Sequence, residues 1–245
     1  MSELLMKEKA IFFWSGGKDS ALCLYRILQE DHYEVVALVT TISADLKRVS
    51  MHGIREELIE EQAKNIRLKE GGKGIFLHKM YINSHSTNEV YEASLERILL
   101  NYKLEGIHKV IFGDIFLEDL RAYRETLLHK YQMHGVYPLW KLPTGVLINQ
   151  FIDLGFKTRI CCCDSRLLGE HVLGKVIDEE LVRSFPPEID PCGENGEFHT
   201  FTFAGPLFSQ EIRLKLGESV LKVYELESGM KQEHGFWFID MQSEL

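Results

Sequence analysis

Six consecutive residues near the start of the chain have the types and spacing to hold the phosphates of a nucleotide. They directly follow the apolar run 10–14, and apolar residues at helical spacing come after them. A strand, a glycine turn and a helix in this order present free backbone N–H groups and the positive end of a helix dipole to an anion. The glycines allow a ligand to approach closely because they lack a Cβ, and the lysine adds a mobile positive charge. The six residues are Ser15, Gly16, Gly17, Lys18, Asp19 and Ser20.

This spacing differs from the two common phosphate-binding motifs. The P-loop separates its glycines as G-x-x-x-x-G-K-[ST], and the dinucleotide fingerprint reads G-x-G-x-x-G. A capped helix after a glycine turn, without a ligand, is the plain structural alternative, and the strand-to-helix context argues against it. We therefore predict a cradle for the pyrophosphate part of a nucleotide.

A second polar group lies in residues 192–200, which read CGENGEFHT. Two carboxylates, an amide, an imidazole and a hydroxyl in one glycine-spaced loop are groups that orient a substrate or bind a divalent cation. Composition alone favours a simpler structure, a β-turn with surface carboxylates. The side chains concerned are Glu194, Asn195, Glu197, His199 and Thr200.

The first 140 residues alternate strand and helix patterns. Apolar runs at 10–14, 35–39, 75–82, 110–112 and 136–140 predict strands, with helical periodicity between them. Strands that are apolar throughout are typical of a doubly wound parallel sheet, covered on both faces, in an α/β fold. Ligands bind beyond the carboxyl ends of such strands. Residues 15–20 and the pair Gly113 and Asp114 follow strand ends, and Thr40 is a further predicted nucleotide contact.

The pattern changes after Trp140 to a smaller α+β part. Pro143 opens and Gly155 closes a predicted helix. A strand at 156–163 and a short helix at 178–184 follow, and then four strands in β-hairpins, at 198–203, 212–216, 220–226 and 235–240. We predict a nucleotide-binding domain at residues 1–140 and a substrate domain at residues 141–245.

The composition is that of a globular protein, and we expect it in the cytoplasm. The 245 residues carry a net charge of −9, which argues against a dedicated nucleic-acid surface. No apolar run approaches the roughly 18 residues of a membrane helix, and the polar start of the chain lacks the apolar part of a signal peptide. The five cysteines include no C-x-x-C pair, so neither a disulfide framework nor a zinc ribbon is indicated.

Three segments together resemble known families. Residues 15–20 match the S-G-G-x-D-S signature of the PP-loop of the N-type ATP pyrophosphatases at every position. Residues 192–200 resemble the C-E-G-G-E-[YF]-[EH]-T segment of the diphthine–ammonia ligase family, with Gly193 before Glu194 and Asn195 in place of a glycine. Residues 113–124 resemble that family's G-x-I-x-x-x-Y-Q-R-x-R segment, with Leu120 in place of the Tyr-Gln pair, and residues 138–140 match its P-L-W.

The resemblance implies a Rossmann-like fold of the adenine nucleotide alpha hydrolase type and a ligase reaction. A substrate carboxylate, on a protein side chain or a small molecule, would attack the α-phosphate of ATP, pyrophosphate would leave, and ammonia or another amine would displace AMP to form an amide. Catalytic roles fall on Lys18, Asp19, Glu194, Glu197 and His199, and Asp19 is a predicted Mg²⁺ ligand. Predicted substrate contacts are His52, Arg121, Arg124, Asn195 and Thr200.

Two other functions stay open at this point. A PP-loop enzyme that thiolates a tRNA base would need a sulfur-carrying cysteine, for which Cys192 is the best placed, and a basic surface that this acidic chain lacks. A non-catalytic nucleotide-binding module is the other alternative function, and the complete S-G-G-x-D-S loop counts against it.

Some residues also have a simpler interpretation. Arg121 and Arg124 fit a solvated helix face as well as a binding site, and His52 fits a structural role. A homodimer is one option for the assembly.

Overall fold

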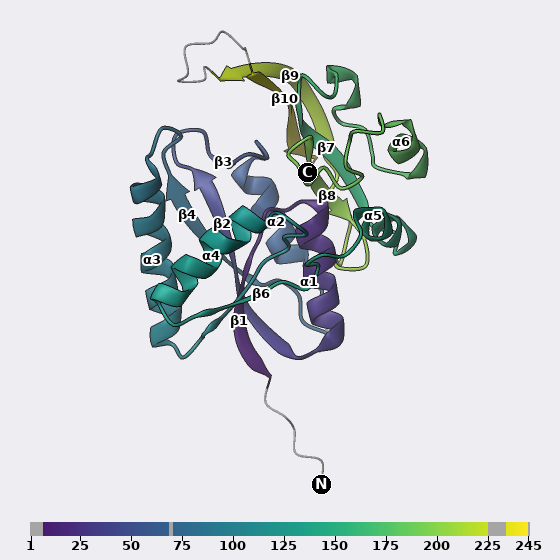
Figure 1. Cartoon of the computed structure of the whole chain (residues 1–245). Coiled ribbons are helices and arrows are strands. Elements are labelled where there is room, and N and C mark those ends of the chain that lie inside the picture. The colour runs from purple at the N-terminus through teal and green to yellow at the C-terminus, as the bar shows by residue number, and fades with distance from the viewer. Residues whose placement is uncertain (1–6, 69–70, 225–233, 245) are drawn as a thin grey trace.

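The computed structural model describes residues 7–68, 71–224 and 234–244, which form two sheets with helices around them (Figure 1). The elements of the first part are β1 (Glu8–Phe13), α1 (Lys18–Glu30), β2 (Tyr33–Ser43), β3 (Arg48–Val49), α2 (Glu56–Asn65), β4 (Phe76–Ile82), α3 (Asn88–Leu104), β5 (Lys109–Ile111), α4 (Glu118–Lys130) and β6 (His134–Val136). Those of the second part are α5 (Thr144–Asp153), β7 (Lys157–Asp164), the 3₁₀ turn η1 (Glu170–Val172), α6 (Glu179–Ser184), β8 (Phe198–Ala204), β9 (Leu214–Tyr224) and β10 (His234–Ser243).

The first sheet is mostly parallel, as the apolar strands predicted. β1 pairs with β2 and β5, β2 with β4, and β5 with β6, all parallel, while the short β3 pairs antiparallel with the end of β2. After β4 the chain crosses to the other side of β1 to add β5 and β6. The carboxyl ends of β1 and β5 therefore flank the topological switch point, where such sheets bind ligands.

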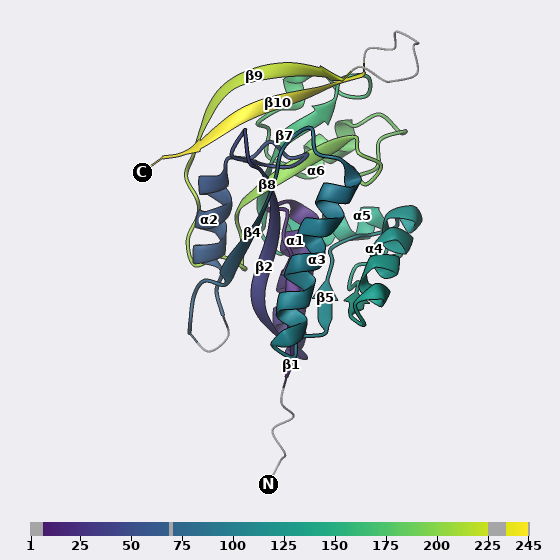
Figure 2. The same ribbon diagram turned by 90° about the vertical axis from the view of Figure 1, so that its left-hand side faces the viewer.

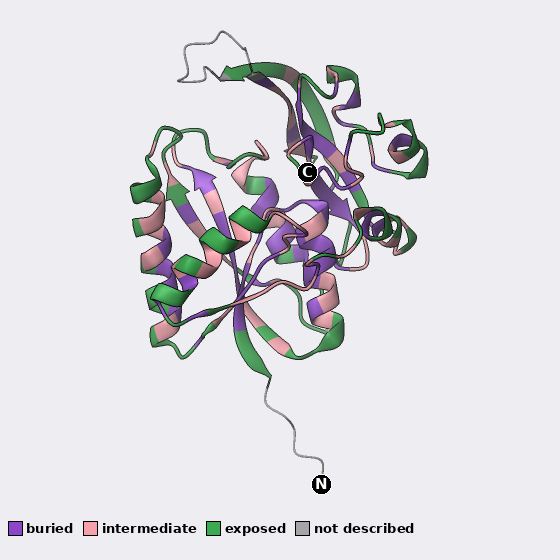
Figure 3. Cartoon of the chain, in the orientation of Figure 1, coloured by how far each residue is buried: buried purple, intermediate pink, exposed green. Residues whose placement is uncertain are grey.

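Alternate residues of β1 face opposite layers. Phe12 packs with α1 and α2 on one face, while Ile11 packs with α3 and α4 on the other. This follows from the two-residue period of a strand, and it explains why β1 is apolar at every position from Ala10 to Phe13. Figure 2 shows α3 crossing the sheet, and Figure 3 shows the inward sides of the helices buried and their outer sides exposed.

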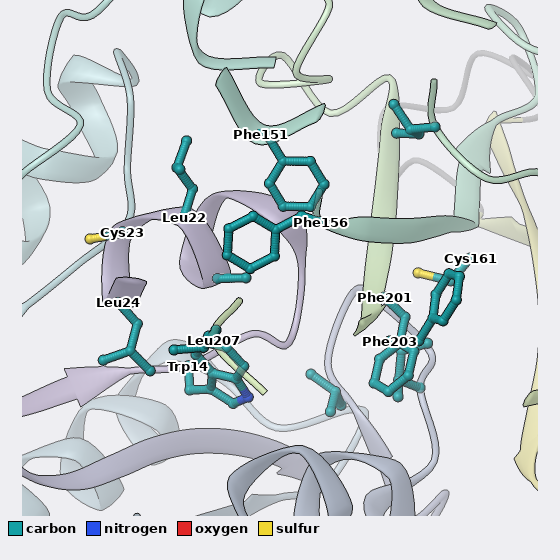
Figure 4. Close-up of a cluster of buried hydrophobic side chains, with 14 of the residues drawn as sticks. Trp14, Leu22, Cys23, Leu24, Phe151, Phe156, Cys161, Phe201, Phe203 and Leu207 are labelled. Carbon is teal, nitrogen blue, oxygen red and sulfur yellow. The ribbon is translucent and has the colours of Figure 1, made fainter. Parts of the chain in front are cut away.

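The second sheet has the order β8-β7-β10-β9 and is antiparallel throughout. Its inner face shares one hydrophobic cluster with α1, so the two parts of the chain are joined by a common core. Figure 4 shows Trp14 and Leu22 of the first part near Phe151, Phe156 and Phe201 of the second. The predicted boundary at residue 140 stays a prediction, although each sheet draws its strands from one side of it.

Two strand predictions were wrong. The strand predicted at 136–140 ends at Val136, and residues 137–140 form the turn that follows it. The stretches 212–216 and 220–226 fall on one strand, β9, which begins at Leu214; residues 225 and 226 lie outside the described part. Gly217, between the two stretches, lies opposite Asp240, where the pairing register shifts between Ile239 and Met241. Glycine inside a strand often marks such a bulge.

Among the described residues, each helix is either too short or too polar to span a lipid bilayer.

Candidate nucleotide and carboxylate site

The predicted phosphate loop connects β1 to α1 at the switch point, and the second sheet covers it. The backbone N–H of Lys18 donates to the Thr200 hydroxyl on β8 at 3.0 Å, and that of Gly17 donates to the Ser15 hydroxyl at 3.3 Å. The Ser20 hydroxyl lies 3.1 Å from that of Ser15 and donates to the Gly17 carbonyl. The sequence suggested that the amides of Gly17 and Lys18 are free, but both donate to hydroxyl oxygens. An oxyanion that binds this loop would replace these hydroxyl oxygens as the acceptor.

Lys18 is buried instead of mobile, which corrects the expectation from sequence. Its side chain is 4% exposed, and its ammonium donates to Asp19 at 2.7 Å and to the Cys192 carbonyl. Burial opposes its charge, but the carboxylates of Asp19 and Glu194 outweigh this effect and raise the pKa of Lys18 above its ordinary value. An ammonium has three donors, and Asp19 and Cys192 use two. One N–H is left for a phosphate oxygen, as far as the described residues show.

Gln62 on α2 holds the glycine turn and was missed from sequence. It is fully buried, and its amide group donates to the carbonyls of Gly16, at 3.0 Å, and Thr202, at 2.6 Å, while its oxygen accepts from the Trp14 indole at 3.0 Å. The signal was a glutamine on the apolar side of a predicted helix. A buried amide needs several partners, and this one joins the loop to both sheets.

Two histidine rings contact each other beside the loop, with their planes 35° apart. The rings of His52 and His199 lie 4.6 Å apart, and His52 Nδ1 is 3.1 Å from the Thr200 carbonyl oxygen. A Cβ on Gly17 would come within 3.1 Å of the His52 ring. Burial lowers the pKa of His52 to about 4 and that of His199 well below its ordinary value, so both rings are neutral at pH 7. The structure thus places two predicted site residues against the phosphate loop.

The loop between α6 and β8 is organised by Asp190, which sequence analysis missed. Asp190 accepts from the backbone of Cys192 at 2.8 Å and of Glu194 at 3.2 Å, and from the Thr144 hydroxyl at 2.6 Å. Its own backbone N–H donates to Glu197 at 2.9 Å. Short-range carboxylate bonds of this kind fix a turn, so this loop has a defined shape beside Lys18.

Glu197 and Asn195 lie in this loop and contact each other. Glu197 is 2% exposed, and one of its oxygens accepts from the Asn195 amide at 3.0 Å. The other oxygen has no partner among the described residues. Glu197 therefore helps to hold the loop, and Asn195, exposed at its tip, supports that carboxylate.

Glu194 reaches from this loop to the end of β5. Its carboxylate accepts from the backbone N–H of Ile115 at 2.9 Å and of Phe116 at 3.3 Å. Burial, together with the negative charge of Asp19, raises the pKa of Glu194 to about 7, although both amides and Lys18 oppose the shift. A carboxyl group that titrates near neutral pH beside a phosphate loop is suited to proton transfer.

Three further predicted residues close the site around β5 and β2. A Cβ on Gly113 would come within 3.2 Å of Ser20 Cα, so this glycine lets β5 approach α1 closely. Asp114 forms an ion pair with Arg124. Thr40 is 1% exposed and its hydroxyl donates to the Trp14 carbonyl. The Thr40 hydroxyl thus has a partner within the protein, and its predicted contact with a nucleotide stays a prediction.

Arg121 lies on α4, and its guanidinium covers the rings of Tyr137 and Trp140. These two aromatic residues belong to the segment that follows β6. The site thus brings together residues 15–20, His52, Gly113, Asp114 and the loop 190–200, with the two arginines at its β5 side.

No group of three His, Cys, Asp or Glu side chains suited to a metal is found in the described part of the chain. Mg²⁺ is usually held by one or two carboxylates plus substrate phosphates, so Asp19, which is 28% exposed, fits that requirement.

Comparison with known proteins places the chain in a family. Residues 8–134 match the model of the diphthamide synthase N-terminal domain, and residues 143–245 match that of the diphthamide synthase C-terminal domain. The chain is similar to the diphthine–ammonia ligase of Schizosaccharomyces pombe, with 26% identity over 84% of the chain and 36% of that protein. It is also similar to the diphthine–ammonia ligases of Danio rerio, with 25% identity over 84% of the chain and 86% of the relative, and Rattus norvegicus, with 26% over 84% and 83%. The two consecutive matches span nearly the whole sequence, and the chain belongs to the diphthamide synthase family.

Proposed function

We propose that this protein is an ATP-dependent ligase that adenylates a carboxylate and then amidates it with ammonia, releasing AMP and pyrophosphate. The observation that carries this proposal is that Glu194 and Thr200, from the second part of the chain, meet Lys18 at the phosphate loop. A nucleotide-binding loop alone would be consistent with a protein that only binds a nucleotide. The Glu194 carboxyl beside it, with a pKa of about 7, favours an enzyme that transfers a proton to or from a second substrate.

In this proposal the phosphate loop binds the triphosphate of ATP. Phosphate oxygens replace the Ser15 and Thr200 hydroxyls as acceptors for the amides of Gly17 and Lys18, and the remaining Lys18 N–H donates to the leaving pyrophosphate. Charge grows on that group as the α–β bond breaks, and donors that are already fixed stabilise it without reorganisation. Asp19 would hold Mg²⁺, which supplies further neutralisation of the phosphate charge.

Glu194 is the preferred base for the amine that attacks the adenylate. A base works best when its pKa lies near the working pH, and the pKa of Glu194 is raised to about 7. The pKa of His199 lies well below its ordinary value because of burial, so its neutral ring is a weak base. We assign His52 and His199 to the wall of the nucleotide site.

The thiolation alternative loses its best residue. Cys192 is 2% exposed and its thiol donates to the Thr144 carbonyl at 3.4 Å. Burial raises the pKa of this thiol far above the ordinary value, whereas a sulfur carrier needs an accessible thiolate.

The test is to incubate the protein with ATP, Mg²⁺, ammonium and a peptide that carries diphthine, the acceptor in the name of the relatives. We expect AMP and pyrophosphate in equal amounts, whereas ADP and phosphate would contradict the proposal. Lys18→Met, which keeps the volume of the buried side chain, should lose turnover with its fold intact by circular dichroism. Lys157→Met removes a lysine that is 55% exposed and should leave the rate unchanged.

A further inference from the structure

We propose that Arg121 is the anchor for the carboxylate of the acceptor substrate and that Tyr137 and Trp140 are the residues that position it. This inference rests on the proposed function, because it names the residue that holds the second substrate of the same site. From sequence alone Arg121 and Arg124 are equivalent, because they are two cations one helical turn apart on α4. The structure separates them.

The guanidinium of Arg124 is already neutralised by the protein. It donates to the Asp114 carboxylate and lies 4.3 Å from the centroid of the Phe112 ring. The guanidinium of Arg121 has neither a hydrogen-bond acceptor nor a salt-bridge partner among the described residues. Its guanidinium carbon lies 4.4 Å from the centroid of the Tyr137 ring and 4.5 Å from that of Trp140. The Arg121 guanidinium therefore lies in a defined position with no carboxylate at ion-pair distance among the described residues.

The aromatic support of Arg121 is held in place by the core. The Tyr137 ring stacks on Phe112 with centroids 5.4 Å apart and planes 19° apart, and it meets Trp140 at 61°. Leu139, between the two aromatic residues, is fully buried. Gly135 makes room for the ring, because a Cβ there would come within 2.5 Å of it. A platform fixed in this way keeps Arg121 from adopting its many other rotamers, which lowers the entropy cost of binding.

Arg121 lies at the end of the sheet where the reaction is proposed. The Lys141 backbone N–H donates to the Ile115 carbonyl at 2.7 Å, and the Ile115 N–H donates to Glu194. The platform and the proposed base are therefore bound to the same residue after β5. Asp114, three positions after the end of β5, is within electrostatic reach of both Asp19 and Arg121.

The chemistry of the guanidinium selects the ligand. Its faces cover aromatic rings, so its N–H donors at the edge are available, and their planar fork matches the two oxygens of a carboxylate. A phosphate of ATP offers the same oxygens, and we commit to the carboxylate because the phosphate loop already provides donors for the nucleotide.

The experiment measures binding by isothermal titration calorimetry with three probes: the diphthine peptide, the same peptide as its carboxylate methyl ester, and α,β-methylene-ATP. For Arg121→Gln we expect at least tenfold weaker binding of the acid, unchanged binding of the ester, and nucleotide binding within twofold of wild type. Tyr137→Leu and Trp140→Leu should weaken binding of the acid. Tyr137→Phe, which keeps the aromatic ring, should bind the acid as tightly as wild type. Arg183→Gln is the matched control, since Arg183 is 73% exposed on α6.

Each other result overturns the inference. Wild-type protein that fails to bind the acid, or binds acid and ester equally, has no carboxylate anchor. Weaker nucleotide binding by Arg121→Gln with unchanged peptide binding assigns the anion to a phosphate. Turnover separates the two proposals: Arg121-dependent peptide binding without AMP formation contradicts only the proposed function, whereas AMP formation by Arg121→Gln at the wild-type KM for peptide contradicts only the anchor.

Discussion

The backbone N–H of Lys18 donates to the hydroxyl of Thr200 at 3.0 Å, although 182 positions of sequence separate the two residues. Thr200 is 2% exposed and lies on β8, so the second sheet touches the first residue of α1 directly. The N-terminal amides of a helix have no partner within the helix. A side chain from the other part of the chain occupies one of them here, and a nucleotide phosphate would compete for the same amide.

Thr200→Val should destabilise the protein and change nucleotide binding. The substitution keeps the side-chain shape but leaves the buried Lys18 amide without its partner, which we expect to cost about 1–3 kcal/mol in urea unfolding. Because a bound phosphate would supply the missing acceptor, ATP should stabilise Thr200→Val more than it stabilises wild type. Thr202→Val is the control, since the Thr202 hydroxyl bonds to Thr158 at 3.3 Å, away from the loop amides. An equal ATP effect in both variants would contradict this account.

Glu194→Gln should remove a pH dependence near neutrality. The folded-state pKa of Glu194 is raised to about 7 from 4.5, so the folded protein keeps a proton that the unfolded chain has lost in that window. The carboxyl therefore favours folding below about pH 4.5, and this contribution is lost as the pH rises through about 7. The free energy of unfolding of wild type, relative to Glu194→Gln, should fall over that range in urea titrations. A constant difference would show that Glu194 titrates normally.

The same substitution should act on the rate of amide formation. Wild-type kcat/KM should rise with pH until Glu194 is ionised and then level off, because only the carboxylate accepts a proton. Glu194→Gln should be slow throughout and flat across that range. A wild-type profile retained by the variant would exclude Glu194 as the base.

Alanine at the two loop glycines should have different effects. Gly16 has φ +79°, and a Cβ there would lie 2.5 Å from Ile59 and 2.6 Å from Gln62, so Gly16→Ala should cost about 1–3 kcal/mol of stability. Gly17 has an ordinary φ of −84°, and its Cβ would meet His52 and Thr200 at 3.1–3.3 Å. Gly17→Ala should therefore lose less stability and mainly weaken ATP binding by calorimetry. The reverse order would contradict the described loop.

Asp240→Asn tests the contact that holds β10 on the first part of the chain. Asp240 accepts from Arg55 at 2.9 and 2.8 Å and from Arg48 at 2.7 Å, and these bonds hold its pKa below the usual range. The ionised Asp240 carboxylate stabilises the folded protein above its ordinary pKa, and this stabilisation is lost as the pH falls and the carboxylate is protonated. Because both arginines are partly exposed, we expect a loss of about 1–2 kcal/mol at pH 7 in urea. Glu179→Gln, which breaks an exposed pair within α6, should cost less than about 0.5 kcal/mol.

The strands, helices and phosphate loop could be predicted from sequence, because each depends on residues close together in the chain. Continuous apolar strands and helical periodicity indicated the parallel sheet, and the six adjacent residues 15–20 indicated the phosphate loop. The reading failed where a distant partner changes the outcome. The predicted break between the strands 212–216 and 220–226 is a bulge opposite Asp240, and Lys18, expected to be mobile, is buried against the Cys192 carbonyl.

The site itself depends on pairs that no local pattern contains. Gln62 is one polar residue in a predicted helix, and only the fold brings it to the carbonyls of Gly16 and Thr202. The difference between Arg121 and Arg124 has the same origin, since Asp114 neutralises one of them and the aromatic rings hold the other.

The most direct measurement follows an oxygen atom. If the acceptor carboxylate attacks the α-phosphate and ammonia then displaces AMP, a carboxylate labelled with ¹⁸O must pass one labelled oxygen to AMP. Mass spectrometry of the nucleotide after turnover with labelled diphthine peptide, ATP and ammonium should show AMP heavier by one ¹⁸O. Unlabelled AMP, or the label in inorganic phosphate, would contradict adenylation of the carboxylate at this loop.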